Sequence, residues 1–109
     1  MKEQIYVTEE NLLLIKEAMD FSIENASKGI LFVLEMVREK VSNCDDSMLR
    51  LDGMEMEIIL VSLIEYGIYL LSFHSDKGSL CMIEAIRIDQ LKQGYQSRNG
   101  PKIMFNYTI

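Results

Sequence analysis

Three side chains of the types used in nucleophilic catalysis follow one another at His74, Ser75 and Asp76. A catalytic triad needs its side chains to converge on one reacting atom, and successive residues of a turn do not reach that geometry. His74 is also the only histidine of the chain, so the His-Glu-x-x-His zinc helix and the paired Glu-x-x-His motifs of di-metal bundles are absent. We therefore expect an ordinary polar turn here, and no catalytic residue, metal or cofactor in the chain.

The two cysteines, Cys44 and Cys81, are no better candidates for a nucleophile. Cys44 precedes Asp45 and Asp46, whose negative charges disfavour the thiolate. The cysteines form no Cys-x-x-Cys motif, which favours a reducing cytoplasm, although a single bridge between them is compatible with the sequence. The first residues, MKEQIYVTEEN, contain no basic segment followed by an apolar run, so no secretion signal is predicted.

One carboxylate stands in an apolar setting. Glu65 interrupts a long apolar stretch, and burial would raise the pKa of its carboxyl group, as catalytic acids require. A lone carboxylate on the polar side of a helix is more commonly solvated. An enzyme or small-molecule binder that uses Glu65 is therefore only the third of three functional hypotheses.

An acidic group in the middle of the chain suggests a binding function instead. Complementary charge speeds association and fixes register, so this group could mimic a polyanion and fill the basic cleft of a nuclease or toxin. The simpler interpretation is that these carboxylates complement the dipole at a helix start. A nearby methionine could add an adaptable contact surface, or simply fill the core. The candidate partner-binding residues are Asp45, Asp46, Asp52, Glu55, Glu57 and Met54.

The acidic group surrounds the start of Asp52 to Phe73, the most apolar stretch of the chain. Asp52, with Glu55 three residues later, resembles a capping box, so we predict a helix over about residues 53–73. Its polar positions fall in one stripe and leave most of the circumference apolar. The residues of this stripe are Glu55, Ser62, Glu65, Tyr69 and Ser72.

So much apolar surface on one helix exceeds what three neighbouring helices of a small chain can cover. We expect a second chain to bury part of this helix and of the apolar segment 30–41, either in a symmetric homodimer or in a complex with another protein. The candidate self-association residues are Ile59, Leu63, Tyr66 and Leu70.

Three further helices are predicted around the central one. Thr8 is a suitable N-cap for a helix over residues 9–26, where apolar residues recur at spacings of three and four. Gly29 tolerates the left-handed conformation that ends many helices, so a second helix is expected over residues 30–41. One continuous helix through Gly29 costs only about 1 kcal/mol more and remains an alternative. The other segments are a loop over 42–51, a turn over 74–78 and a helix over 79–95.

The end of the chain has strand character. Residues 102–109 are rich in β-branched and aromatic residues, so they could pair with the extended Ile5–Val7. Residues 79–89 also suit a strand, and the alternative fold is α+β with residues 79–109 in a small sheet. We favour a helix because Glu84 and Arg87 can pair on one helical face. The predicted fold is all-α, with two consecutive αα-hairpins forming a four-helix arrangement.

The two predicted hairpins resemble each other in sequence. Residues 27–38 align without gaps on residues 76–87, with Lys, Gly, Leu, Glu and Arg identical. Either duplication or chance similarity of two amphipathic hairpins explains the likeness. We predict a single helical domain over residues 1–109, with pseudo-repeat halves of about 8–41 and 52–91.

Composition limits the kinds of partner. The chain has 109 residues, 49% of them hydrophobic, which suits one domain with a modest core. A net charge of −6 disfavours nucleic acid and anionic membranes, and attracts a basic protein. The run Ile58 to Phe73 lies between Glu57 and His74 and is interrupted by Glu65. It is therefore shorter than the roughly 20 apolar residues that cross a bilayer. We therefore expect no nucleic-acid and no membrane partner.

Two hypotheses lead. The first is a small, acidic, non-enzymatic protein-binding module of the cytoplasm, such as an inhibitor, antitoxin, immunity or anti-defence protein, that occupies a partner's surface. The second is a self-associating structural or regulatory homodimer with the helix over residues 53–73 at its interface.

Overall fold

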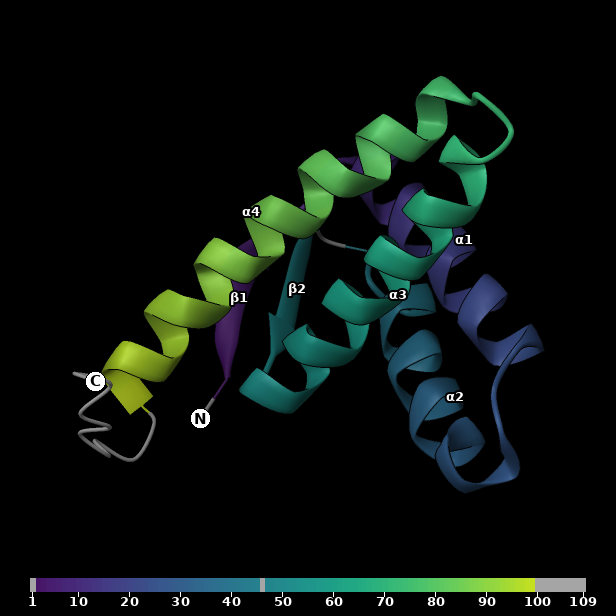
Figure 1. The fold of residues 1–109 in the computed structure, drawn as a ribbon. Coiled ribbons are helices and arrows are strands. Elements are labelled where there is room, and N and C mark those ends of the chain that lie inside the picture. The colour runs from purple at the N-terminus through teal and green to yellow at the C-terminus, as the bar shows by residue number, and fades with distance from the viewer. Residues whose placement is uncertain (1, 46, 100–109) are drawn as a thin grey trace, which may run out of the picture.

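The computed structural model describes residues 2–45 and 47–99. Within these ranges the order of elements is strand, helix, helix, repeated once (Figure 1). The elements are β1 (Glu3–Tyr6), α1 (Glu9–Glu24), α2 (Lys28–Ser42), β2 (Met48–Leu51), α3 (Gly53–Leu71) and α4 (Asp76–Asn99). The predicted arrangement of two αα-hairpins is confirmed, and a small two-stranded sheet is added to it.

The two strands pair antiparallel and connect the start of the chain to its middle. Ile5 lies opposite Leu49, and both side chains are buried, as is that of Leu51. Because successive side chains of a strand point to opposite faces, Arg50 between the two leucines is exposed. The predicted loop over residues 42–51 is therefore wrong at β2. The alternation of buried and exposed residues there is too short to be recognised in the sequence.

The small sheet also revises the predictions for the two ends of the chain. The extended arm at Ile5–Val7 has β2 as its neighbour, while the strand predicted over residues 102–109 lies outside the described residues. Residues 79–89 are helical, so the α+β alternative was right to include a small sheet but wrong about its place. Glu84 and Arg87 form the expected ion pair, 2.6 Å from nitrogen to oxygen.

The first hairpin consists of two helices separated by a short break. Thr8 caps α1 as predicted, since its hydroxyl accepts a hydrogen bond from the N–H of Asn11 at 3.1 Å. Asn25 ends α1, and its side chain donates to the carbonyl of Phe21 at 2.8 Å. Gly29 lies inside the first turn of α2, so its predicted role as the helix terminator is wrong.

The second hairpin is the most extensive helix contact of the fold. α3 and α4 approach closely at Gly67 and Gly78, where a methyl group on Gly78 would lie 2.9 Å from the carbonyl oxygen of Gly67. The helices are joined by a turn in which His74 adopts the left-handed conformation, with φ of 57°. The N–H of Ser75 donates back to the carbonyl of Leu70, which satisfies one free carbonyl at the end of α3.

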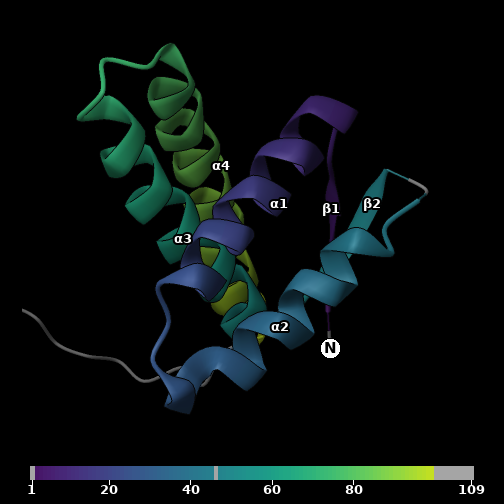
Figure 2. The ribbon, with the colours of Figure 1, turned by 90° about the vertical axis from the view of Figure 1, so that its right-hand side faces the viewer.

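α3 occupies the centre of the molecule and packs against both α1 and α4. α2 and α4 lie on opposite sides, with α1 and α3 between them (Figures 1 and 2). Both strands and all four of these helices contribute to one core. Its largest fully buried side chains are Ile5, Val7, Ile15, Met19, Val37, Val41, Leu49, Leu51, Met56, Ile59, Leu63 and Ile88.

Candidate interaction surface

Glu55 belongs to the acidic group predicted to bind a partner, but its side chain is buried in the fold. Its side chain is nearly buried, at 4% exposure, and closes the capping box with Asp52 through two hydrogen bonds of 2.8 Å. Lys2 and Lys40 each form an ion pair with its carboxylate. Burial alone would raise the pKa of Glu55, but hydrogen bonds from Lys40, the Asp52 backbone and Lys2 outweigh it and lower that pKa. Glu55 thus joins the start of the chain, α2 and α3.

The other members of the group lie in different settings. Glu57 forms an ion pair with Lys92 of α4. Asp45 is exposed just after α2, and Asp46 lies outside the described residues. Met54 is exposed in the first turn of α3. Because lysines already match the charges of Glu55 and Glu57, the group presents less free negative charge than its sequence suggests.

The four residues predicted for self-association are partly inside the core. Ile59 and Leu63 have no exposed surface, whereas Tyr66 and Leu70 are half-buried and pack against the core. The first two therefore cannot contact a second chain while this fold is kept. Other apolar residues of α3 face solvent instead, and these are Met54, Val61, Ile68, Tyr69, and Leu71.

The residues of the predicted polar stripe on α3 are also divided between buried and exposed positions. Glu55 and Ser62 are buried, whereas Glu65, Tyr69 and Ser72 are exposed. Glu65 lies at a groove of about 370 Å³ between α1, α2 and α3, with its side chain open to water. The buried setting that would make Glu65 a catalytic acid is therefore missing.

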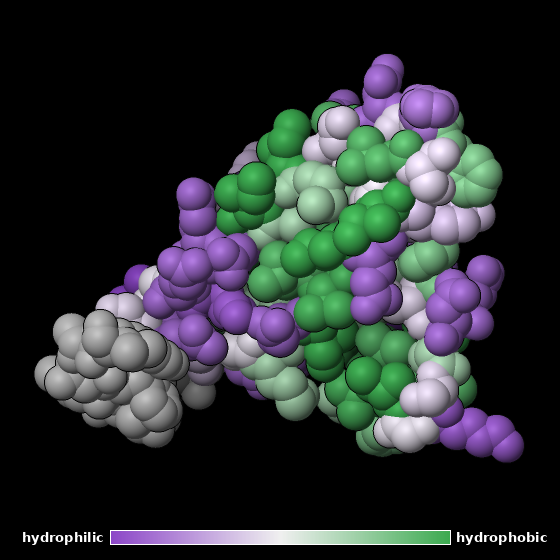
Figure 3. All heavy atoms as spheres, in the orientation of Figure 1, coloured by the Kyte–Doolittle hydropathy of each residue, from purple (hydrophilic) through white to green (hydrophobic). Residues whose placement is uncertain are grey.

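The outer side of α4 carries an apolar ridge, formed by Leu80, Ile83 and Ile86. All three side chains are more than half exposed. Their spacing of three residues puts them opposite Cys81 and Ile88, which face the core. Figure 3 shows hydrophobic surface that extends over α4 and across to α3. The sequence signal for this ridge is the nearly unbroken apolar run from Leu80, which leaves α4 apolar on more than one side.

On one side of the ridge, α1 and α4 enclose a groove of about 440 Å³, here called the α1–α4 groove. Leu13, also more than half exposed, lines it from α1, while Leu80 and Ile83 line it from α4. The two helices both pack on α3 but contact each other little, so the groove stays open. Along α4 it runs from Lys77 to Arg87, about 15 Å or roughly three helical turns.

Ion pairs lie at both ends of the α1–α4 groove. Lys77 pairs with Glu17 of α1, and this contact raises the pKa of Lys77. At the other end, Arg87 pairs with Glu84 and donates a hydrogen bond of 3.0 Å to the carbonyl of Tyr6. The hydrogen bonds with Glu84 raise the pKa of Arg87. Both cations therefore remain charged and committed to carboxylates of the groove itself.

On the other side of the ridge, α3 and α4 form a second, smaller groove of about 260 Å³. Its walls are apolar apart from one carboxylate. The lining residues are Leu60, Ile64, Met82, Ala85, Ile86 and Asp89. Ile68 and Leu71 of α3 are also exposed, so apolar surface continues along this helix toward the turn into α4.

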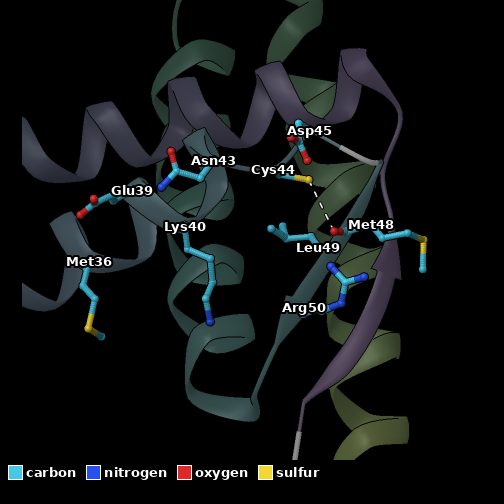
Figure 4. A pocket seen from close by; sticks show the side chains of 9 residues that line it. All are labelled: Met36, Glu39, Lys40, Asn43, Cys44, Asp45, Met48, Leu49 and Arg50. Atoms are coloured by element: carbon cyan, nitrogen blue, oxygen red, sulfur yellow. Dashed lines mark hydrogen bonds between the residues drawn. The ribbon is translucent and has the colours of Figure 1, made fainter.

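The two thiols are free and differ in setting. A pocket of about 490 Å³ lies between α2 and β2. In this pocket the thiol of Cys44 points to the carbonyl of Met48, 3.6 Å away (Figure 4). Cys81 is buried behind the α1–α4 groove, and burial raises its pKa to about 11. Cys81 is therefore a protonated thiol at neutral pH. The disulfide that the sequence left open is not formed.

The sequence matches no known family model, and no curated protein or solved structure shows significant similarity to the chain. Across residues 2–45 and 47–99, none of the helices combines the length and the apolar character needed to cross a membrane. The same residues contain no group of three or more His, Cys, Asp or Glu side chains arranged to hold a metal ion. The apolar ridge and the two grooves beside it form the candidate interaction surface in this part of the chain.

Proposed function

We propose that this chain is a non-enzymatic protein-binding module that occupies a partner's surface through the apolar ridge of α4. One observation carries the proposal: Leu80, Ile83 and Ile86 lie together, each more than half exposed, beside a groove whose other wall exposes Leu13. Burying apolar surface away from water is favourable by a free energy of about 25 cal/mol per Å². Contiguous exposed patches therefore favour protein contact on soluble proteins.

The class of protein follows from this mode of action. Inhibitors, antitoxins, immunity proteins and anti-defence proteins act by covering a surface, and they need no catalytic group of their own. The net charge of −6 supports a basic protein as the partner. The free thiols support a reducing compartment, the cytoplasm.

A homodimer is the second candidate, and a separate observation favours it. Val61, Ile68 and Leu71 expose apolar surface on α3, the helix predicted to mediate self-association. A symmetric contact would cover the same patch on both copies. The dimer interface proposed for this helix therefore uses these residues in place of Ile59 and Leu63.

Affinity capture with matched variants tests the leading proposal. Ile83→Asp places a charge on the ridge, whereas Phe32→Asp changes a side chain that is also more than half exposed, on α2 across the molecule. We expect the wild-type chain and Phe32→Asp to retain a partner that Ile83→Asp loses. If all three capture the same proteins, the ridge is not the binding surface.

Light scattering during gel filtration tests the second candidate. A dimer that Ile68→Asp converts to a monomer supports self-association through α3. A monomer at micromolar concentration contradicts it.

A further inference from the structure

We infer that the α1–α4 groove binds one amphipathic helix of a basic partner protein. This inference rests on the proposed protein-binding function and names the chemistry of the occupant. The groove is about three helical turns long, and its exposed apolar residues Leu13, Leu80 and Ile83 come from both walls. A helix that presents apolar residues at positions i, i+3 or i+4, and i+7 fits such a groove.

The arrangement of the three neighbouring helices favours a helical occupant. α1 and α4 both rest on α3 and are held apart from each other. A helix in the groove between them would pack on α1 and α4 from the side opposite α3. Together the four would form a closed helical bundle.

An extended peptide has less to bind at this place. The walls of the groove are helices, whose backbone N–H and C=O groups are already bonded within each helix. Recognition of an extended segment relies largely on the unpaired backbone groups of a strand edge. The groove therefore selects by side-chain packing, which a preformed helical stripe supplies.

The charges of the groove determine the sign of the partner. Carboxylates of Glu10, Glu17 and Glu84 line it against the two cations Lys77 and Arg87. Glu17 and Glu84 already pair with these cations, so the acidic surplus at the groove comes from Glu10. Lysine or arginine residues beside the apolar stripe of the occupant would be attracted by this negative charge.

The negative potential at the groove disfavours a second copy of the chain as the occupant. Every copy carries the same net charge of −6 and the same surplus at the groove. Two copies would therefore bring like charges together at the rim, which opposes association.

The probe for this inference is a pair of synthetic amphipathic peptides of about 15 residues, long enough to form a helix. One contains leucine and lysine, and the other has glutamate at every lysine position. Fluorescence anisotropy measures the affinity of each for the wild-type chain. We expect the Leu/Lys peptide to bind at least about tenfold more tightly than the Leu/Glu peptide, and the ratio to fall as added salt shortens the Debye length.

Neutral substitutions on both walls locate the binding site without adding charge. Leu13→Ser and Ile83→Ser each remove one exposed apolar anchor, and each should weaken the Leu/Lys peptide by about tenfold. Phe32→Ser is the matched control, because it changes an exposed apolar side chain on α2, and it should leave the affinity of the peptide within about twofold. Circular dichroism checks that the variants fold. Glu10→Lys should weaken the Leu/Lys peptide and strengthen the Leu/Glu peptide.

The outcomes separate this inference from the function on which it rests. Unchanged affinity in both wall variants would overturn the groove as the site. Equal binding of the two peptides, insensitive to Glu10→Lys, would overturn the basic character of the occupant. A dimer that Ile83→Ser dissolves would make a second copy the occupant, and would overturn the inference while the protein-binding function stands. That function fails instead when affinity capture recovers no partner that depends on Ile83.

Discussion

Replacing Glu55 with glutamine tests the idea that this residue of the acidic group is a structural anchor. The carboxylate is nearly buried, accepts the backbone N–H of Asp52 and pairs with Lys2 and Lys40. Glu55→Gln keeps the shape of the side chain and one oxygen for Asp52, but removes the charge that holds both lysines.

The size of the effect depends on how exposed the lysines are. Removing one partner of a fully buried ion pair costs about 3–5 kcal/mol. The side chains of Lys2 and Lys40 are 46% and 31% exposed, so both ammonium groups can return to water when the carboxylate is gone. We therefore expect the free energy of unfolding to fall by about 1–2 kcal/mol, close to the value of charge-assisted hydrogen bonds. For a domain of this size the melting temperature should fall by about 4–8 °C.

The loss should depend on pH with a defined sign. In the folded chain the pKa of Glu55 lies below its ordinary value of 4.5. Its charge therefore stabilises the fold fully above that value, and this stabilisation disappears as the pH falls through the folded pKa. Glutamine does not titrate, so the difference between the wild-type chain and Glu55→Gln should vanish in acid.

Urea unfolding at neutral pH, and again well below the ordinary carboxyl pKa, measures both effects. Glu57→Gln is the matched control, two positions further along α3, with a side chain 49% exposed and an ion pair to Lys92. It should cost less than about 1 kcal/mol, as exposed pairs do. A Glu55→Gln variant as stable as Glu57→Gln, or a loss that persists in acid, would refute the reasoning.

Two further predictions concern the helices and the thiols. Gly78→Ala should lower the free energy of unfolding by about 1–3 kcal/mol, because the new methyl group would meet the backbone of α3. Gly29→Ala should raise it by about 0.5–1 kcal/mol, since its added methyl group has nothing within 4 Å apart from its own helix backbone and chain neighbours. Urea unfolding of both variants measures this, and equal effects would contradict the close helix approach. A thiol-reactive dye should label Cys44 in the folded chain and reach buried Cys81 only in denaturant. Mass spectrometry after labelling counts the adducts, and rapid labelling of Cys81 in the folded chain would contradict its burial.

The helices were predictable because their signals are local. Thr8 marks the start of α1, Asp52 and Glu55 form the capping box of α3, and the pairing of Glu84 with Arg87 distinguishes helix from strand in α4. Each signal lies within a few residues of the feature that it predicts. The strand β2 has only four residues, and its pairing with β1 depends on a distant segment, so it was missed.

The orientation of α3 was not predictable, because the helix is apolar on most of its circumference. Periodicity does not distinguish Leu63, which is in the core, from Ile68, which faces solvent. Packing against α1 and α4 decides between them. The burial of Glu55 has a similar cause, since its partner Lys2 stands far away in the sequence. The candidate site therefore emerged on α4 and not at the predicted acidic group.

The pairing of β1 with β2 has a consequence for the newly synthesised chain. β1 leaves the ribosome before its partner β2, which follows only after the whole of α1 and α2. Local helical contacts form quickly, whereas a distant strand pair must wait for the chain that separates its members. Ile5, which is buried in the folded chain opposite Leu49, thus lacks this partner until β2 emerges. A product that stops before β2 would expose an unpaired edge, so premature termination should yield an aggregation-prone fragment in place of a working half.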